Sequence, residues 1–416
     1  MRQGIEFQEM TETRVSEPAF QAGRRGDSAR GDCWMGWTPS KDGNFDLELS
    51  SKVEVLYGDA IREMLTNLAK DVGLEKGLLE VEDRGALPFI HKARLEALAQ
   101  KTLGNPDLRV PPEESGASIA EPIRKRPRRS RLYLPGNEPK YMLNAALHRP
   151  DAVILDLEDS VAPTAKADAL CLVRHALHAL DWGDCERMVR VNQGELGLAD
   201  IAALLDAPFH LVLLPKIEDA EEVQKFEEAA GDTPLLFMPI LETARGVLKA
   251  VDIAEASTRN VALTLGLEDL TVDLGVVKTP EGAETLFARS FVVHAAKACG
   301  LQAIDSVYGN VGDEEGLRAS VREAKALGFE GKGCVHPRQI RVVHEELAPS
   351  AEQIEKACAI VEAFEEAEAQ GEAVVSLGSK MIDPPVVQRA LNVVRGAESA
   401  GLLAADWREA KEESES

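Results

Sequence analysis

Residues 152–159 have the sequence AVILDLED, an apolar run that ends in three carboxylates. A strand with no polar alternation is buried on both faces, as in a parallel sheet covered by helices. Eight such units within about 215 residues predict a TIM barrel, an α/β fold in which each parallel strand is followed by a helix. The other seven apolar runs, each followed by a segment of helical period, are LYLPG (132–136), MVRVN (188–192), FHLVLLPK (209–216), LLFMPILE (235–242), VALTLGLED (261–269), QAIDSVYG (302–309) and KGCVHP (332–337).

An open, doubly wound sheet is the alternative topology for alternating strands and helices. A glycine-rich phosphate loop after the first strand would favour it, but LPGNEP at 134–139 lacks the GxGxxG pattern. We therefore expect the barrel over residues 130–346 and a C-terminal helical lid and tail over residues 347–416. Ser350 and Gln353 have the spacing of a capping box, which predicts that a helix begins there.

Polar side chains occur at the carboxyl ends of seven of the eight predicted strands. In TIM barrels the active site lies at that rim, so the strand ends predict a functional site. These residues are Asp156, Glu158, Asp159, Arg190, Asn192, Lys216, Glu242, Glu268, Asp269, Asp305 and His336.

The rim is rich in hard oxygen donors, which suit Mg²⁺ or Mn²⁺ better than Zn²⁺. A divalent ion held by two carboxylates, with waters left over, can bind a 2-oxo or hydroxy acid through its oxygens. Arg190 would then hold a substrate carboxylate in bidentate fashion. This set of groups favours a metal-dependent aldol or Claisen-type lyase, which stabilises an enolate.

Several rim residues have two interpretations at this stage. Lys216 could be a Schiff-base nucleophile, as in metal-free aldolases, or could act through its charge. His336 could donate a proton or position a loop, and Asp305 and Tyr308 could shape the pocket. Three carboxylates at one strand end repel each other unless a cation or a helix N-terminus is near. We therefore expect supporting roles, rather than direct ligation, among Asp156, Glu158, Asp159, Glu268 and His336.

The motifs RRSRLYLPGN, AVILDLEDSVAP, VRVN, LPKIE, PILETARGV, LGLEDL, GFEGKGCVHPRQI and GSKMIDPPV occur in this order between about residues 128 and 394. Together they resemble the citrate lyase beta-subunit family of aldolase-type lyases. The resemblance implies a TIM barrel, an oligomer, and a C-terminal segment that reaches a neighbouring subunit's site.

The same resemblance implies roles for individual residues. Glu242 and Asp269 are expected to bind Mg²⁺, and Arg190 the carboxylate of the 2-oxo acid product. Asn192 and Lys216 are assigned with Arg190 to substrate binding. Asp383, in MIDPP, resembles the acid/base aspartate that related acyl-CoA lyases supply from the lid, so Arg190 and Asp383 are the predicted catalytic residues.

Residues 46–103 form a second predicted module, with an α+β pattern. SSKVEVLYGDAIRE and VEDRGALPFIHKARLEAL resemble the citrate lyase gamma subunit, an acyl carrier protein. In that family a serine just before a small residue and Asp carries a coenzyme-A-like prosthetic arm. In SARGDCWMG, Gly31 and Asp32 place Arg30 at that position, and Ser28 is the alternative attachment residue.

The remaining segments have few periodic patterns. Residues 1–45 are interpreted as flexible, because Gly, Ser, Arg and Asp alternate there. Residues 104–129 are interpreted as a linker, because they contain five prolines. Their terminal basic run, RKRPRR, is interpreted as solvated linker beside a strand rather than as a nucleic-acid signal.

Composition limits the functional classes. The 416 residues contain 47 Lys and Arg against 71 Asp and Glu, a net charge of −24, which disfavours nucleic-acid binding. No apolar run approaches the roughly 18 residues of a membrane span, and MRQGIEFQEM lacks a signal-peptide core. The six cysteines have no CxxC spacing, so reduced thiols and a cytoplasmic location are expected.

The sequence thus predicts a Mg²⁺-dependent carbon–carbon lyase. It would cleave a citryl- or malyl-type 3-hydroxyacyl thioester to an acetyl thioester and a 2-oxo acid. The thioester would be carried by a coenzyme-A-like prosthetic group or by free coenzyme A, as in malyl-CoA or citramalyl-CoA lyases. A homo-oligomer and citrate-lyase-type partner subunits are expected; a non-catalytic carrier or scaffold subunit and a Schiff-base aldolase are the alternatives.

Overall fold

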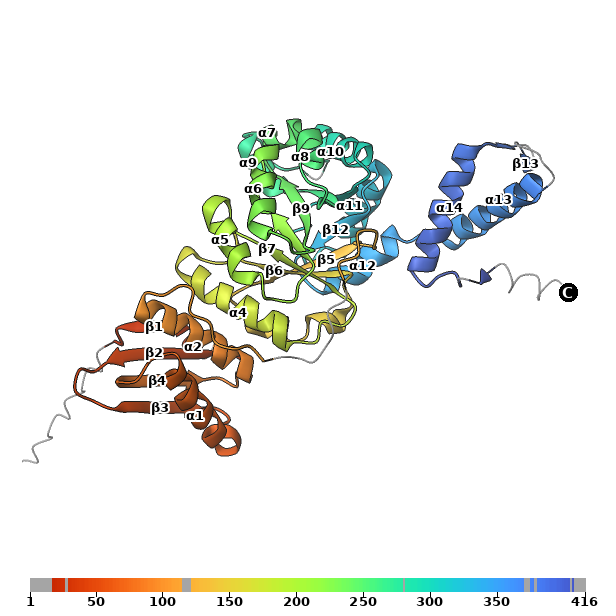
Figure 1. Cartoon of the computed structure of the whole chain (residues 1–416). Helices are drawn as coiled ribbons and strands as arrows, with labels where there is room; N and C mark the ends of the chain where they lie inside the picture. Colours follow the sequence, from red (N-terminus) through yellow and green to blue (C-terminus); the bar gives the residue numbers. More distant parts are fainter. Residues whose placement is uncertain are drawn as a thin grey trace, which may run out of the picture. The chain divides into compact units, whose positions relative to one another are not determined.

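The computed structural model describes residues 17–26, 29–113, 121–279, 281–369, 375–377, 380–404 and 406–407 (Figure 1). The chain forms two compact units. The first comprises residues up to 117 together with 136–143 and 161–180, and the second comprises 118–135, 144–160 and the chain from 181 onward. Within the described ranges, no helix combines the length and the apolarity needed to cross a bilayer.

The first unit contains a four-stranded sheet in the order β1-β2-β4-β3. Its strands are β1 (Phe20–Gly23), β2 (Cys33–Pro39), β3 (Phe45–Ser51) and β4 (Gly77–Asp83). β2 is antiparallel to β1 and β4, whereas β3 and β4 are parallel. Because a parallel connection needs a crossover, helix α1 (Glu54–Asp71) joins them, and α2 (Pro88–Leu103) follows β4.

The prediction of flexibility through residue 45 is wrong for the described part of that segment. β1 and β2 lie within it, and β2 is an inner strand of the sheet. Trp34, Met35 and Trp37 of β2 are buried. Their apolar surface stabilises the strand, and the polar, glycine-containing loops on either side obscured this short apolar run in the sequence.

The second unit contains the predicted eight-stranded barrel. All its strands are parallel, and it closes in the order β10-β11-β12-β5-β6-β7-β8-β9 (Figure 1). The TIM-barrel prediction is therefore confirmed. The strands are β5 (Ser130–Pro135), β6 (Ala152–Asp156), β7 (Glu186–Arg190), β8 (Leu211–Leu214), β9 (Leu236–Leu241), β10 (Ala262–Leu265), β11 (Gln302–Asp305) and β12 (Gly331–Cys334).

Alternate residues of the barrel strands form one buried apolar cluster. Successive side chains of a strand point to opposite faces, so this cluster identifies the inward-facing positions. The next inward positions toward the carboxyl ends are polar. Two residues beyond the apolar Ile154, Met188 and Ile240, the inward-facing residues are Asp156, Arg190 and Glu242.

Helices follow the barrel strands along the chain. Several begin at a side-chain N-cap; for example, the carboxylate of Asp219 accepts the N–H of Glu222 at the start of α6. The helices are α3 (Pro139–Met142), α4 (Lys166–Ala179), α5 (Gly194–Leu204), α6 (Ala220–Ala230), α7 (Ala244–Leu248), α8 (Ala250–Glu255), α9 (Leu267–Asp273), α10 (Leu286–Ala298), α11 (Glu314–Leu327) and α12 (Arg338–Leu347).

The prediction of a solvated basic run at 124–129 is wrong for its last two residues, whereas Arg124 and Lys125 are exposed as expected. Arg128 is fully buried, and its Nε and Nη2 donate to both oxygens of Glu186 at 2.6 and 2.7 Å. Arg129 forms a similar fork with Asp151. These arginines belong to the amino-terminal side of the barrel because the acids at the starts of β6 and β7 need counter-charges.

The C-terminal region contains two long helices, α13 (Ala351–Ala369) and α14 (Pro384–Ser399). Strands β13 (Val375–Leu377) and β14 (Lys380–Ile382) pair between them. The predicted capping box is present, since the Ser350 hydroxyl accepts the N–H of Gln353 and the Gln353 side chain accepts the N–H of Ser350. Val361 and Val394 belong to the buried cluster that joins the two helices.

We predict that Arg128→Met lowers the free energy of unfolding by about 3–5 kcal/mol, because it leaves Glu186 buried without a counter-charge. The double variant Arg128→Met/Glu186→Met should lose less than this single variant. Urea unfolding followed by circular dichroism measures both. Arg341→Met is the control, since Arg341 is an exposed ion-pair partner, and it should change the value by about 0.5 kcal/mol or less. Equal losses in the single and double variants would contradict the prediction.

Candidate functional site

A pocket of about 380 Å³ opens at the carboxyl ends of the barrel strands. Most of its polar lining comes from the inward-facing positions that continue the barrel's apolar layers. Among the side chains that line it are Tyr133, Asp156, Arg190, Glu242, Asp269 and Ser306. The structure therefore brings together residues that the sequence places at the ends of four different strands.

Arg190 is held by acids from the end of the neighbouring strand. Its Nε and Nη2 donate to the two oxygens of Asp156 at 2.6 and 2.8 Å, and its Nη1 lies 3.0 Å from Oε2 of Glu158. The other Glu158 oxygen accepts from Gln193 at 2.6 Å. The guanidinium also lies 5.3 Å from the centre of the Tyr133 ring. These contacts fix the arginine. Its positive charge also offsets the repulsion predicted between Asp156 and Glu158.

The Asp156 contact limits how Arg190 can meet a ligand. It occupies the Nε–Nη2 edge, which is the usual bidentate edge of an arginine. A guanidinium carries five N–H groups, and three of them are engaged by Asp156 and Glu158. A ligand carboxylate would therefore approach the Nη1–Nη2 end. Although burial opposes it, the hydrogen bonds and charge of Arg190 hold the pKa of Asp156 below its ordinary value.

Lys216 connects two strand ends. Its backbone N–H donates to Oε1 of Glu242 at 2.8 Å, and its Nζ lies 3.1 Å from Oδ1 of Asp269. The residue has φ 48°, a left-handed conformation that is uncommon outside glycine and often found at functional sites. Partial burial tends to lower the pKa of Lys216, but the hydrogen bond and charge of Asp269 outweigh it and raise the pKa.

Glu242 is buried, with 2% of its surface exposed. Burial, helped by the charges of Glu158 and Asp269, raises its pKa to about 8, although the hydrogen bond from the Lys216 N–H opposes the shift. Gly266 makes room for the carboxylate, because a Cβ atom there would lie 2.2 Å from Oε2 of Glu242. The glycine of LGLED is thus explained by close approach.

The arrangement fits a divalent cation. Glu242 and Asp269 supply oxygen donors at one side of the pocket, and the raised pKa of Glu242 indicates a carboxylate whose charge is not balanced by the protein. Among the described residues, no group of three or more His, Cys, Asp or Glu is arranged as a ligand set. A cation held by two carboxylates and completed by substrate and water oxygens is typical of Mg²⁺.

Other predicted residues take supporting positions. Asn192 donates from its backbone and its side chain to Asp200. His336 Nδ1 accepts the N–H of Arg338. Neither Asn192 nor His336 is among the pocket residues.

Acidic residues also differ in their surroundings. Asp305 is buried against Lys332 and Arg289. Glu268 is largely exposed at the rim and pairs with Lys278 at 2.5 Å. Asp159 lines the pocket and lies 4.0 Å from Arg190.

Asp383 is exposed and caps α14, where its Oδ1 accepts the N–H of Val386 at 3.2 Å. Tyr308 donates to Asp313 and is not among the pocket residues.

The first strand of the barrel, β5, contributes Arg131 and Tyr133 to the pocket. Neither residue lies at a strand end, so neither was predicted, but the two-residue alternation of SRLYLP places both on the inward face of the strand.

The candidate attachment region lies in the first unit. Ser28 is outside the described residues. Asp32 is buried, and both of its oxygens accept from Arg94, at 3.0 and 2.9 Å. Arg30, two residues earlier, is exposed. Asp32 therefore anchors this loop, while Arg30, which the sequence resemblance matches to the carrier serine, is exposed.

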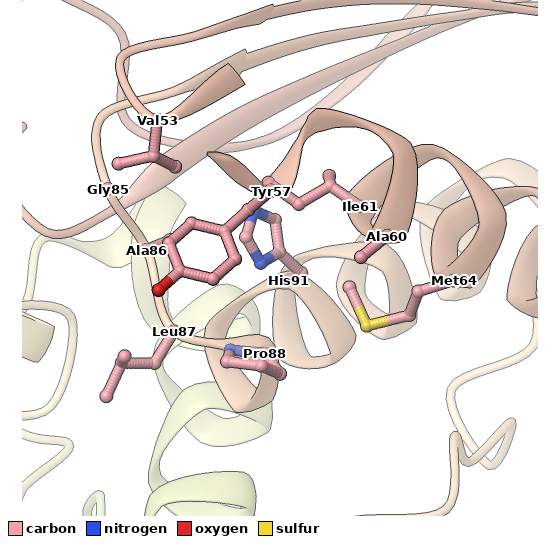
Figure 2. Close-up of a pocket in the computed structure, with 10 residues that line it drawn as sticks. All are labelled: Val53, Tyr57, Ala60, Ile61, Met64, Gly85, Ala86, Leu87, Pro88 and His91. Carbon is pink, nitrogen blue, oxygen red and sulfur yellow. The ribbon is translucent and has the colours of Figure 1, made fainter. Parts of the chain in front are cut away.

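A second cavity, of about 440 Å³, lies between α1 and α2 in the first unit (Figure 2). Its lining is mostly apolar, with Ile61, Met64 and Leu87 among the contributing side chains. Figure 2 shows that Tyr57 and His91 are also among the residues that line it. His91 lies 3.3 Å from Asp83. This cavity lacks the cluster of acids and cations found at the barrel rim.

Comparisons with known proteins match both parts of the chain. The sequence model of the HpcH/HpaI aldolase/citrate lyase family matches residues 129–337, which span all eight barrel strands. The model of the malonate decarboxylase delta subunit matches residues 22–102.

Individual relatives agree with the family match. Citrate lyase subunit beta of Haemophilus influenzae is 40% identical over 285 residues, which are 65% of this chain and 97% of that protein. Human mitochondrial citramalyl-CoA lyase is 37% identical over 66% of this chain and 86% of its own. The crystal structure of CitE from Mycobacterium tuberculosis with magnesium, acetoacetate and coenzyme A has a TM-score of 0.57 and 32% identity; the match covers 66% of this chain and 99% of that chain.

The raised pKa of Glu242 predicts how stability depends on pH in the metal-free protein. The folded state keeps a proton on Glu242 up to about pH 8, whereas the unfolded state loses it near the ordinary glutamate value. Stability from this group is therefore full at low pH and falls as the pH rises toward 8, by at most about 1.4 kcal/mol per pH unit. Urea unfolding in EDTA between pH 5 and 9 should show this fall in the wild type. Glu242→Gln should lack it, and identical pH profiles would contradict the assignment.

Proposed function

The chain belongs to the HpcH/HpaI aldolase/citrate lyase family, and from this premise we propose that it is a Mg²⁺-dependent carbon–carbon lyase. Its substrate would be a citryl- or malyl-type 3-hydroxyacyl thioester, and its products an acetyl thioester and a 2-oxo acid. The observation that carries the proposal is the pocket in which the buried Glu242 and the half-buried Asp269 lie with the anchored Arg190. Relatives named citrate lyase subunit beta and citramalyl-CoA lyase support it.

Glu242 and Asp269 are the residues we propose to hold Mg²⁺. When bound, the ion supplies a Lewis acid that polarises the oxygen of the 2-oxo acid. The Lys216 backbone N–H orients one oxygen of Glu242, and Gly266 leaves space for the other. Magnesium in the CitE structure from Mycobacterium tuberculosis supports this choice of metal.

Arg190 is the group we propose to bind the carboxylate next to the reacting carbon. Asp156 and Glu158 fix its guanidinium before a ligand arrives, which reduces the entropy that binding would cost. Lys216 acts as a fixed positive charge beside Asp269. Its raised pKa favours the ammonium form, whereas a Schiff-base nucleophile must be a neutral amine. This observation disfavours the metal-free aldolase alternative.

The proposed reaction begins when a base removes the proton of the substrate hydroxyl. The carbon–carbon bond then breaks, the alkoxide carbon becomes the carbonyl of the 2-oxo acid, and the electron pair remains on the acyl thioester as an enolate. Asp383 then gives a proton to the enolate carbon, which balances the proton that the base removed from the hydroxyl. Asp383 is exposed at the start of α14, and we propose that a neighbouring subunit supplies it.

Two sources of the thioester are possible in chemical terms. The first unit would act as an acyl carrier if Ser28 held the prosthetic arm, and tethering would raise the effective concentration of the thioester at the barrel. Free acyl-CoA is the second candidate. The arginine at position 30, where the carrier family has its serine, favours free acyl-CoA.

Subunit complementation tests the roles of Asp383, Glu242 and Asp269. Asp383→Asn and Glu242→Gln homo-oligomers should each lose at least about a hundredfold in kcat, the size of a lost acid or charge-stabilising group. Mixing and refolding the two variants should restore activity, because some sites then combine an intact metal pair with an intact aspartate. A mixture of Glu242→Gln with Asp269→Asn is the control. It should stay inactive, because every barrel in the mixture lacks one residue of the metal pair. Failure of the first mixture to recover would contradict the shared site.

Intact mass distinguishes the two thioester sources. Protein purified from its native host should carry a phosphoribosyl-dephospho-coenzyme-A adduct if it is a carrier, and Ser28→Ala should remove the adduct. An unmodified chain that cleaves citryl-, citramalyl- or malyl-CoA would assign it to free acyl-CoA instead.

A further inference from the structure

Arg131 is a buried cation at the inner end of the functional pocket. It belongs to β5, has 1% of its surface exposed, and is among the residues that line the pocket. Two contacts fix its guanidinium. Nη2 donates to Oγ1 of Thr264 and Nη1 to the sulfur of Met238, both at 2.9 Å. The Thr264 hydroxyl itself donates to the Ile304 carbonyl, so its oxygen is oriented to accept from the arginine.

The charge of Arg131 is not balanced by a carboxylate in the described structure. Three arginines of the chain are among its largest fully buried side chains. Arg94 forms a two-point fork with Asp32, and Arg128 forms one with Glu186. Arg131 instead has a hydroxyl and a thioether as acceptors, and its Nε is buried without a hydrogen-bond partner.

This difference has an energetic meaning. A buried charge is costly unless it is paired, so a charge that lines a ligand pocket and lacks a partner is matched to a ligand anion. The neighbouring cations are already engaged, since Arg190 is held by Asp156 and Lys216 by Asp269. Arg131 is therefore the cation with the most unused hydrogen-bonding capacity at the pocket.

The chemistry of the 2-oxo acid indicates which anion this is. Glyoxylate, pyruvate and oxaloacetate share the carboxylate next to the carbonyl, which we have assigned to Arg190. They differ in the remaining substituent, which is hydrogen, methyl or a carboxymethyl group. Oxaloacetate alone among these three brings a second carboxylate, and a second carboxylate needs a second cation.

We propose that Arg131 binds the distal carboxylate of a 2-oxo dicarboxylic acid and so selects a citryl-type thioester over citramalyl and malyl types. This inference rests on the proposed function, because it takes the barrel pocket as the 2-oxo acid site. Arg131 thereby acts as a specificity-determining residue, in a layer of the barrel below the groups that bind the reacting end.

Equilibrium binding of oxaloacetate and pyruvate in the presence of Mg²⁺, measured by calorimetry directly after mixing, tests the proposal. The wild type should bind oxaloacetate about 10- to 100-fold more tightly than pyruvate, the strength of a charge-assisted hydrogen-bonded pair. Arg131→Met should remove this preference and leave pyruvate affinity within about threefold. Arg131→Lys, which keeps the charge but not the fork, should retain part of the preference.

A stability measurement separates this role from a structural one. Because it removes an unpaired buried charge, Arg131→Met should melt at or above the wild-type temperature. A large loss of stability, or equal weakening of both ligands, would overturn the role of Arg131. If the wild type binds pyruvate but does not prefer oxaloacetate, the inference fails and the lyase proposal stands. If neither acid binds with Mg²⁺, the proposed function fails as well.

Discussion

The ion pair between Arg190 and Asp156 is the interaction on which the functional end of the barrel depends. The two residues are cross-strand partners at the last positions of β6 and β7, and each continues the inward-facing side of its strand. An unpaired acid or base at that depth would be costly. With both present, the strands can end in charged groups that point into the barrel, and Glu158 can join them without forcing the acids apart.

The charged residues of the pocket form two groups. In one group acids and a cation neutralise each other, and in the other an acid has no ion-pair partner among the described residues. On the β6–β7 side, Arg190 neutralises its neighbours, and the pKa of Asp156 is lowered. On the β9 side, Glu242 has a backbone N–H as its hydrogen-bond partner, and its pKa is raised to about 8. The first group fixes Arg190 before a ligand arrives and leaves the Nη1–Nη2 end of its guanidinium for a carboxylate. The second is incomplete and is suited to a bound cation, which is how preorganised sites divide support from chemistry.

The eight barrel strands could be predicted because each is a buried apolar run with a recognisable length and a helix after it. The gathering of Asp156, Arg190, Glu242 and Asp269 in one pocket also follows from their places at strand ends. Asn192 shows the limit of that rule. It comes two residues after the last residue of β7, in the connection before α5 begins at Gly194, so the alternation of the strand no longer sets its direction.

Other features depend on contacts that no local pattern records. β2 could not be predicted because its apolar residues lie in a short run between polar loops, and its stability comes from pairing with β1 and β4 on both sides. Similarly, RKRPRR has the composition of a solvated segment. Its Arg128 is buried because Glu186, 58 residues later, needs a counter-charge. Long-range ion pairs of this kind are set by tertiary structure and leave no periodic signal in the sequence.

Glu242 and Arg131 line the same pocket, yet no ion pair joins them in the described structure, although an ionised Glu242 would have the charge opposite to that of Arg131. Pairing them would relieve both desolvation costs. The barrel instead holds each in place by neutral groups: a backbone N–H and Gly266 for the acid, and Thr264 and Met238 for the arginine. Local departures from the most stable arrangement are expected where function requires them. A bound cation would balance Glu242, and a substrate carboxylate would balance Arg131. The two residues together therefore indicate more about the substrate than either does alone.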